Sequence, residues 1–130
     1  MGARFEVVVE AGNLRSGSQT AVHFPHRWTE QGVNVEAKFT GAHLLHLSIA
    51  GCVLNDLYRE AANFGIQVDG VRVLASGSFD DQWASTGITY TVEVSSSASD
   101  ADVARLIAAV DDVAEIPRAI RAGAPVRRIA

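Results

Sequence analysis

One long, mostly apolar segment constrains this chain more than any other feature. Residues 41 to 65 read "GAHLLHLSIAGCVLNDLYREAANFG", and Thr40 before them and Gly65 at their end are typical helix caps. The predicted helix is about 36 Å long at about 1.5 Å per residue. Its first half, from Leu44 to Leu54, is apolar on nearly all sides and must be buried all round. One small sheet cannot cover it.

Segments of alternating apolar and polar residues lie on both sides of this helix and predict β-strands, because one face of a strand is buried while the other meets water. The first two are expected to form a β-hairpin, with Gly12 and Asn13 in the turn. A third strand precedes the helix, and two more follow it. The five segments are residues 5–10, 19–24, 33–39, 66–79 and 87–94.

The last third of the chain predicts two helices and a strand. Ser99 with Asp102 forms a start similar to a capping box, and apolar residues then recur at helical spacing. Pro117 suits the first position of a short further helix, which ends before a final strand at Val126–Ile129. This order of elements defines an α+β fold, and the length fits a single domain over residues 1–130.

Composition argues against two classes of partner. The formal net charge is −4 and the basic residues gather only near the end of the chain, so we expect no nucleic-acid partner. The N-terminus shows no signal-peptide pattern, and no apolar run reaches the length of about 18 residues that a membrane span needs. A single cysteine cannot form an internal disulfide, which fits a reducing compartment. We therefore expect a cytoplasmic protein without a membrane partner.

Small side chains share one face of the long helix. Ser48, Gly51, Cys52 and Asn55 recur at spacings of three and four residues, which lets another helix approach closely. The same helix of a second copy would bury that face in a twofold homodimer. The alternative is that these residues pack against the second helix of their own chain.

Cys52 has two interpretations. Free cysteine is among the most buried residue types and usually behaves as a small hydrophobic side chain. A reactive thiol instead needs access and a neighbouring cation that stabilises the thiolate. Asp56, one turn further on, would oppose ionisation, so the cation must come from elsewhere. Arg15 in the first loop and Arg59 are the available guanidinium groups.

The stretch "HLLHLSIAGCVLNDLYREAANFGIQVDGVRV" resembles the central helix and following strand of the OsmC/Ohr superfamily of osmotically inducible and organic hydroperoxide resistance proteins. The order of elements also resembles that family along essentially the whole chain, including the terminal "IPRAIRAGAPVRRI". The resemblance implies an OsmC-like α+β fold. In such an intertwined homodimer, antiparallel sheets from both chains wrap around the long central helices.

The resemblance further implies thiol-dependent reduction of organic hydroperoxides, with no metal and no other cofactor. The thiolate attacks the O–O bond, releases an alcohol and becomes a sulfenic acid. Cys52 in "AGC" matches the peroxidatic cysteine of the family, and Arg15 in "LRSG" matches the arginine that holds the thiolate and orients the peroxide. Arginine suits this role because it stays charged when partly buried and offers several donors.

The chain departs from the family pattern at the catalytic glutamate. That residue would lie at Ala42 or His43, where no carboxylate stands. His43 is a candidate auxiliary residue, because its imidazole could hydrogen-bond the arginine or a substrate oxygen. Glu30 and Glu36, ahead of the helix, are candidates for the missing carboxylate.

The second departure concerns the resolving cysteine, whose place before Pro117 is taken by Ile116. A sulfenic acid at Cys52 would therefore need an external thiol reductant. The two His-x-x-His spacings in the chain are incomplete metal sites, and we expect no metal.

Three functions stay open from the sequence. The first is a one-cysteine hydroperoxide reductase, an enzyme with Cys52 as nucleophile, Arg15 as its electrostatic partner and apolar pocket walls. The second is a catalytically inactive OsmC-like dimer that binds a small apolar or acidic ligand. The third is a purely structural dimer. We favour the enzyme among them, although the sequence leaves enzymatic activity undecided.

Overall fold

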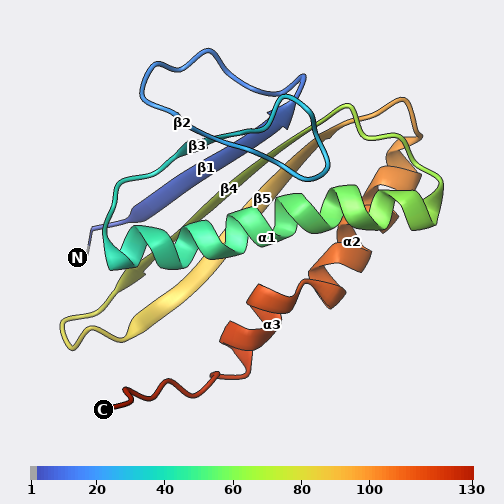
Figure 1. Cartoon of the computed structure of the whole chain (residues 1–130). Helices are drawn as coiled ribbons and strands as arrows, with labels where there is room; N and C mark the ends of the chain where they lie inside the picture. The colour runs from blue at the N-terminus through green and yellow to red at the C-terminus, as the bar shows by residue number, and fades with distance from the viewer. Residues whose placement is uncertain (1–2) are drawn as a thin grey trace.

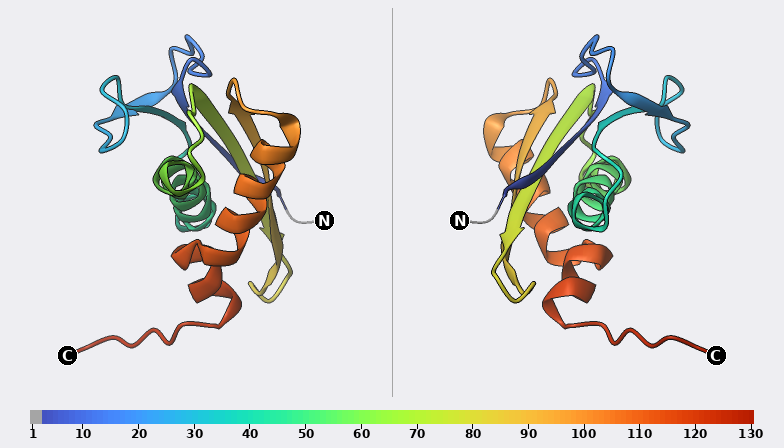
Figure 2. Two further views of the ribbon diagram at one scale, coloured as in Figure 1. Left: turned by 90° about the vertical axis from the view of Figure 1, so that its right-hand side faces the viewer. Right: turned by 90° about the vertical axis from the view of Figure 1, so that its left-hand side faces the viewer.

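The computed structural model describes residues 3–130, which form a five-stranded antiparallel sheet and three helices (Figure 1). The strand order is β2-β3-β1-β4-β5. Helix α1 lies against β1 and β4, while α2 and α3 lie against α1 (Figure 2). The predicted α+β class is confirmed. The elements are β1 (Phe5–Gly12), β2 (Val22–Phe24), β3 (Val33–Glu36), α1 (Gly41–Phe64), β4 (Gly70–Phe79), β5 (Ser85–Ser95), α2 (Asp100–Val113) and α3 (Glu115–Arg121).

Helix α1 begins and ends at the predicted caps. The Thr40 side chain accepts a hydrogen bond of 3.1 Å from the backbone N–H of His43, which satisfies one of the free donors of the first turn. Gly65 has φ 64° and donates its N–H back to the carbonyl of Ala62. These caps bound 24 helical residues and place Cys52 in the middle of the helix.

The core lies between α1 and the two central strands. Val7 and Val9 of β1 pair with Ala75 and Val73 of β4, and all four side chains are at most 1 % exposed. Burying each valine stabilises the fold by roughly 1.5–3 kcal/mol. Helix α1 supplies the other side of this core with Ile49, Val53, Leu54 and Leu57.

The predicted hairpin between the first two strands is wrong. β1 pairs with β3 and β4, whereas β2 pairs with β3 and forms an edge of the sheet. The reason is burial: the helix-facing side of β1 is apolar and fully buried, while all three residues of β2 are exposed. A strand of the first kind belongs in the centre of a sheet, and a short exposed one suits its edge.

The final predicted strand is also absent from the described chain. Residues 124–130 form no helix or strand and run away from the fold, with Val126 97 % and Ile129 79 % exposed (Figure 1). No neighbouring strand of the described chain pairs with this segment, so it forms no β-strand. Pro117 is the third residue of α3 rather than the first, whereas Ser99 caps α2 as predicted.

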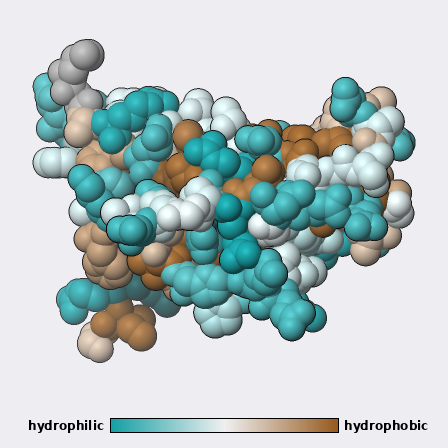
Figure 3. Space-filling view, turned by 90° about the horizontal axis from the view of Figure 1, so that it is seen from above, coloured by the Kyte–Doolittle hydropathy of each residue, from teal (hydrophilic) through white to brown (hydrophobic). Residues whose placement is uncertain are grey.

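One stripe of α1 stays uncovered within the chain. Leu44 is 37 % exposed, Ser48 is exposed, and Gly51 and Asn55 are half-buried, so the apolar half of the helix is not enclosed all round by its own chain. Apolar side chains also reach the surface elsewhere, in patches among hydrophilic residues (Figure 3). Of the helices in the described chain, none is both long and apolar enough to cross a bilayer.

Candidate functional site

Cys52 lies where the middle of α1 meets the start of α3. Its thiol is free and the residue is only 7 % exposed. The backbone N–H of Ile116 donates a hydrogen bond to the sulfur. Ile116 stands where the resembled family has its second cysteine, so the fold brings that position directly against the Cys52 thiol.

Two carboxylates approach the same sulfur. Asp56, one helical turn after Cys52, is 2 % exposed, and its Oδ2 lies 3.8 Å from the Cys52 Sγ. Glu115 is the first residue of α3 and reaches the pair from the neighbouring helix. One ligating atom from each of the three residues lies within 4.8 Å of the other two.

Arg59 balances the charge of these carboxylates from the solvent side. Its guanidinium lies 3.2 Å from the Asp56 Oδ2 and 3.8 Å from the Glu115 Oε2, and it also contacts Glu60 at 3.2 Å. The Arg59 side chain is 42 % exposed. The thiol therefore has carboxylates as its nearest charged neighbours, with a cation behind them.

The surroundings of the thiol keep it protonated. Burial raises the pKa of Cys52 to about 11; the Ile116 N–H opposes this shift, and the charges of Asp56 and Glu115 add to it. Burial likewise raises the pKa of the Asp56 carboxyl to about 6. The pKa of Glu115 is lowered, first by a hydrogen bond from its own backbone N–H. The two carboxyls thus behave as a pair whose pKa values are pushed apart.

Arg15 is held by its own loop in this chain. Its Nε donates to the carbonyl of Gly12 at 3.3 Å, and a terminal nitrogen donates to the Gln31 Oε1 at 2.6 Å. The charged groups that act on the Cys52 thiol are instead Asp56 and Glu115. Within one chain, therefore, Arg15 is engaged elsewhere.

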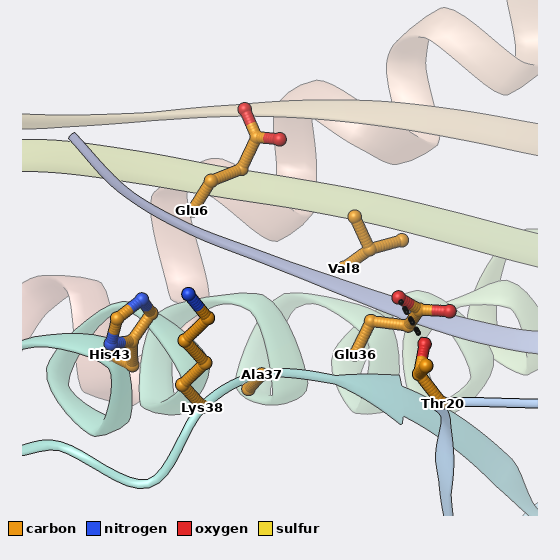
Figure 4. A pocket seen from close by; sticks show the side chains of 7 residues that line it. All are labelled: Glu6, Val8, Thr20, Glu36, Ala37, Lys38 and His43. Atoms are coloured by element: carbon orange, nitrogen blue, oxygen red, sulfur yellow. Dashed lines mark hydrogen bonds between the residues drawn. The ribbon is translucent and has the colours of Figure 1, made fainter.

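His43 lies in the first turn of α1, about 13 Å along the helix axis from Cys52 at about 1.5 Å per residue. Its Nδ1 is 2.6 Å from the Thr40 Oγ1, and its ring packs edge-on against Phe5. It also lines a separate depression of about 370 Å³ near Glu36, in which Glu36 accepts a hydrogen bond from Thr20 (Figure 4).

The histidines of the two His-x-x-His spacings have hydrogen-bond partners of their own. His23 bonds Asn34, His26 bonds Thr29 and Asn55, and His46 bonds the carbonyl of Ala42. The group of Cys52, Asp56 and Glu115 has the spacing of metal ligands, but there Arg59 already neutralises the carboxylates.

The sequence reasoning missed Glu115. Its signal was its position directly before Ile116, because the resemblance places Ile116 beside the thiol and the adjoining residue must then lie close to it as well. Glu30 and Glu36, ahead of the helix, were the candidates for the carboxylate that is missing from the start of α1. The carboxylates beside the thiol come from within α1 and from α3.

An apolar cavity of about 200 Å³ lies between α1, β5 and α3. Its walls include Ile49, one turn before Cys52, and Pro117, next to Ile116. Tyr90 and Arg121 supply polar groups to the same cavity, and the Tyr90 hydroxyl donates to Asp111. This cavity, which Cys52 itself does not line, is therefore mainly apolar with a polar edge.

The fold and this junction define a class: an α+β protein with a buried thiol on a long helix that a sheet covers. The family model for OsmC-like protein matches residues 34–127, and the chain belongs to the OsmC-like protein family. This confirms the resemblance to the OsmC/Ohr superfamily. A search of curated proteins finds no matching relative.

Two solved structures share the fold. The OsmC-like protein from Mycoplasma pneumoniae aligns with a TM-score of 0.61 and 16 % identity, over 66 % of this chain and 64 % of its own. The OsmC-like hydroperoxide resistance protein from Jannaschia sp. CCS1 aligns with a TM-score of 0.52 and 11 % identity, over 98 % of this chain and 91 % of its own. At these identities the likeness is one of fold.

Proposed function

We propose that this protein reduces organic hydroperoxides with Cys52 as its single peroxidatic cysteine, and that an external thiol regenerates it. The observation that carries the proposal is the junction of α1 and α3, where the Cys52 sulfur meets the Ile116 N–H and two carboxylates in a member of the OsmC-like family. A solved structure of the same fold is named a hydroperoxide resistance protein.

The cavity beside the junction supports an organic substrate. Its walls of Ile49, Ile88, Pro117 and Ile120 suit an alkyl or aryl group, and its volume of about 200 Å³ suits a small one. Hydrogen peroxide gains nothing from such walls. We therefore expect faster reaction with cumene or tert-butyl hydroperoxide than with hydrogen peroxide.

The proposed enzyme acts as a homodimer, in which Arg15 of a second copy is the electrostatic partner of the Cys52 thiol. Two observations support a dimer: α1 has an uncovered stripe of small side chains, and an ideal Cβ on Gly51 would meet nothing within 4 Å. Gly51→Leu should therefore leave the single chain folded and shift the protein from dimer to monomer in sedimentation. A monomeric wild-type protein contradicts this part of the proposal.

The test is loss of cumene hydroperoxide in the presence of a dithiol. Wild-type protein should consume the peroxide catalytically, whereas Cys52→Ser should not, although it keeps a hydroxyl donor beside Asp56 and should stay folded. Arg15→Ala should slow the wild-type reaction. Equal consumption by wild type and Cys52→Ser would falsify the proposal. Because the reductant is an external thiol, we place the protein in the cytoplasm.

A second function, ligand binding without catalysis, is favoured by one observation. The thiol is buried and its pKa is raised to about 11, as for a packing residue. A groove of about 360 Å³ between α1 and the β2–β3 region, lined by Phe24, Trp28 and Leu47, would then hold an apolar ligand. In that case Cys52→Ser should bind a fluorescent apolar probe as well as wild type does, and neither should consume peroxide.

A further inference from the structure

We propose that the carboxylates of Asp56 and Glu115 together accept the proton of the Cys52 thiol while it attacks a hydroperoxide, and return that proton to the departing alkoxide. The inference rests on the proposed function and supplies it with a catalytic base. That base replaces the glutamate which the start of α1 lacks.

The geometry places both carboxylates at the reacting atom. The Asp56 Oδ2 lies 3.8 Å from the Cys52 Sγ, and the ligating atoms of Cys52, Asp56 and Glu115 lie within 4.8 Å of one another. The charge of Glu115 acts on both Cys52 and Asp56. A proton that leaves the sulfur therefore has two neighbouring oxygen acceptors, of which the Asp56 Oδ2 already accepts a hydrogen bond from the thiol.

The other elements around the thiol leave this role to the carboxylates. Within one chain Arg59 is the neighbouring cation, and it contacts both carboxylates. The remaining elements packed on α1 present apolar side chains to the core. These are Val7, Val9 and Ala11 of β1, Val71, Val73 and Ala75 of β4, and Leu106 and Val110 of α2.

The pKa of the Cys52 thiol distinguishes two mechanisms. In one, a thiolate forms before the attack; in the other, a base removes the proton during the attack. With a pKa of about 11, only about one thiol in ten thousand is ionised at pH 7. A reaction that requires a preformed thiolate loses that factor. A base that removes the proton during S–O bond formation avoids the loss, because the thiol does not ionise in advance.

The proposed step balances in atoms and electrons. The Cys52 sulfur attacks the terminal oxygen of the hydroperoxide, the S–O bond forms, and the O–O bond breaks heterolytically. Sulfur is oxidised by two electrons and the peroxide is reduced. The thiol proton passes to the Asp56 and Glu115 pair and then to the alkoxide, which leaves as an alcohol. The sulfenic acid keeps the hydrogen of the hydroperoxide, and an external thiol later reduces it.

The test compares Glu115→Gln with wild type and with Glu60→Gln as the matched control. Glu60 also contacts Arg59, at 3.2 Å, but it is outside the group of atoms around the sulfur. Two quantities are measured: the rate constant for Cys52 sulfenic acid formation by cumene hydroperoxide, and the thiol pKa from thiolate ultraviolet absorbance. Glu115 is 63 % exposed, so its substitution should leave the fold intact.

Both quantities should fall in Glu115→Gln. Glu115→Gln removes a negative charge and should lower the thiol pKa, yet it should slow the peroxide reaction at pH 7 by about tenfold or more. Glu60→Gln should change neither quantity. If Glu115 merely opposes ionisation, its loss lowers the pKa and speeds the reaction, and that result overturns the inference while the proposed function stands. A folded wild-type thiol that reacts with no organic hydroperoxide overturns both.

The pH profile of the wild-type protein tests the same inference without a variant. A preformed thiolate with a pKa of about 11 requires the rate to rise about tenfold per pH unit between pH 7 and 9. A carboxylate base that is already ionised at pH 7 gives a rate that is nearly constant over this range and falls below about pH 6. A tenfold rise per unit would overturn the inference.

Discussion

Replacing Ile116 by cysteine should give this chain a stabilising disulfide. The backbone N–H of Ile116 is hydrogen-bonded to the Cys52 sulfur, so a thiol at position 116 starts close to the Cys52 thiol. The bond would close a loop of about 65 residues and stabilise the fold by about 4 kcal/mol through the entropy of the unfolded chain. Ile116 is partly buried against the core, and shortening its side chain costs roughly 1–2 kcal/mol. The net gain is therefore about 2–3 kcal/mol.

The assay oxidises Ile116→Cys with cumene hydroperoxide and counts free thiols by mass spectrometry under native conditions. Both thiols should disappear within a single chain. The melting temperature of the oxidised protein should then exceed that of the reduced protein by about 15 °C, because both forms carry the substitution and differ only by the disulfide term of about 4 kcal/mol. Ile107→Cys is the matched control: Ile107 is a partly buried isoleucine on α2 that lines a different cavity against β5.

Two results would refute the reasoning. One is an Ile116→Cys protein in which both thiols stay free after treatment with cumene hydroperoxide while the chain is folded. The other is a disulfide that lowers the melting temperature, which would mean that the two positions must be strained together. A disulfide in Ile107→Cys as well would show that the reaction reports general mobility rather than the junction of α1 and α3.

Three further predictions concern stability. Thr40→Ala removes the cap of α1 and should lower the free energy of unfolding in urea by about 1 kcal/mol. Gly77→Ala should cost roughly 1–3 kcal/mol, because an ideal Cβ would lie 2.5 Å from the Gly87 carbonyl oxygen and 2.5 Å from the His46 Nε2; wild-type stability would contradict that contact. The pKa of the Asp56 carboxyl rises from 3.8 to about 6 on folding, so its contribution to stability is present below about pH 4 and is lost as the pH rises through about 6. The free energy of unfolding of wild type should therefore fall relative to Asp56→Asn between pH 4 and 6, and a constant difference would be the contrary result.

Local signals explain what the sequence predicted well. The bounds of α1 depend on Thr40 and Gly65, which act within one turn of the helix ends and need no tertiary information. The effect of Asp56, which opposes ionisation of the Cys52 thiol, was predictable for the same reason, because residues four apart on a helix lie on one face.

Non-local pairing explains what the sequence did not predict. A turn at Gly12 and Asn13 is compatible with a hairpin. β1 instead pairs with β4, about 60 residues later, because that pairing buries more apolar surface. Glu115 approaches Cys52 only through the packing of α3 on α1. No pattern within either segment encodes that distance.

The central position of β1 affects how the chain folds during synthesis. β1 leaves the ribosome before the other four strands of its sheet, and one of its edges pairs with β3 after a short delay. Its other edge has to wait for β4, which at about 5–20 residues per second takes roughly 3 to 13 s. During that interval the apolar face of β1 and one row of its backbone donors and acceptors are unprotected, which exposes the nascent chain to misfolding and makes it a substrate for chaperones.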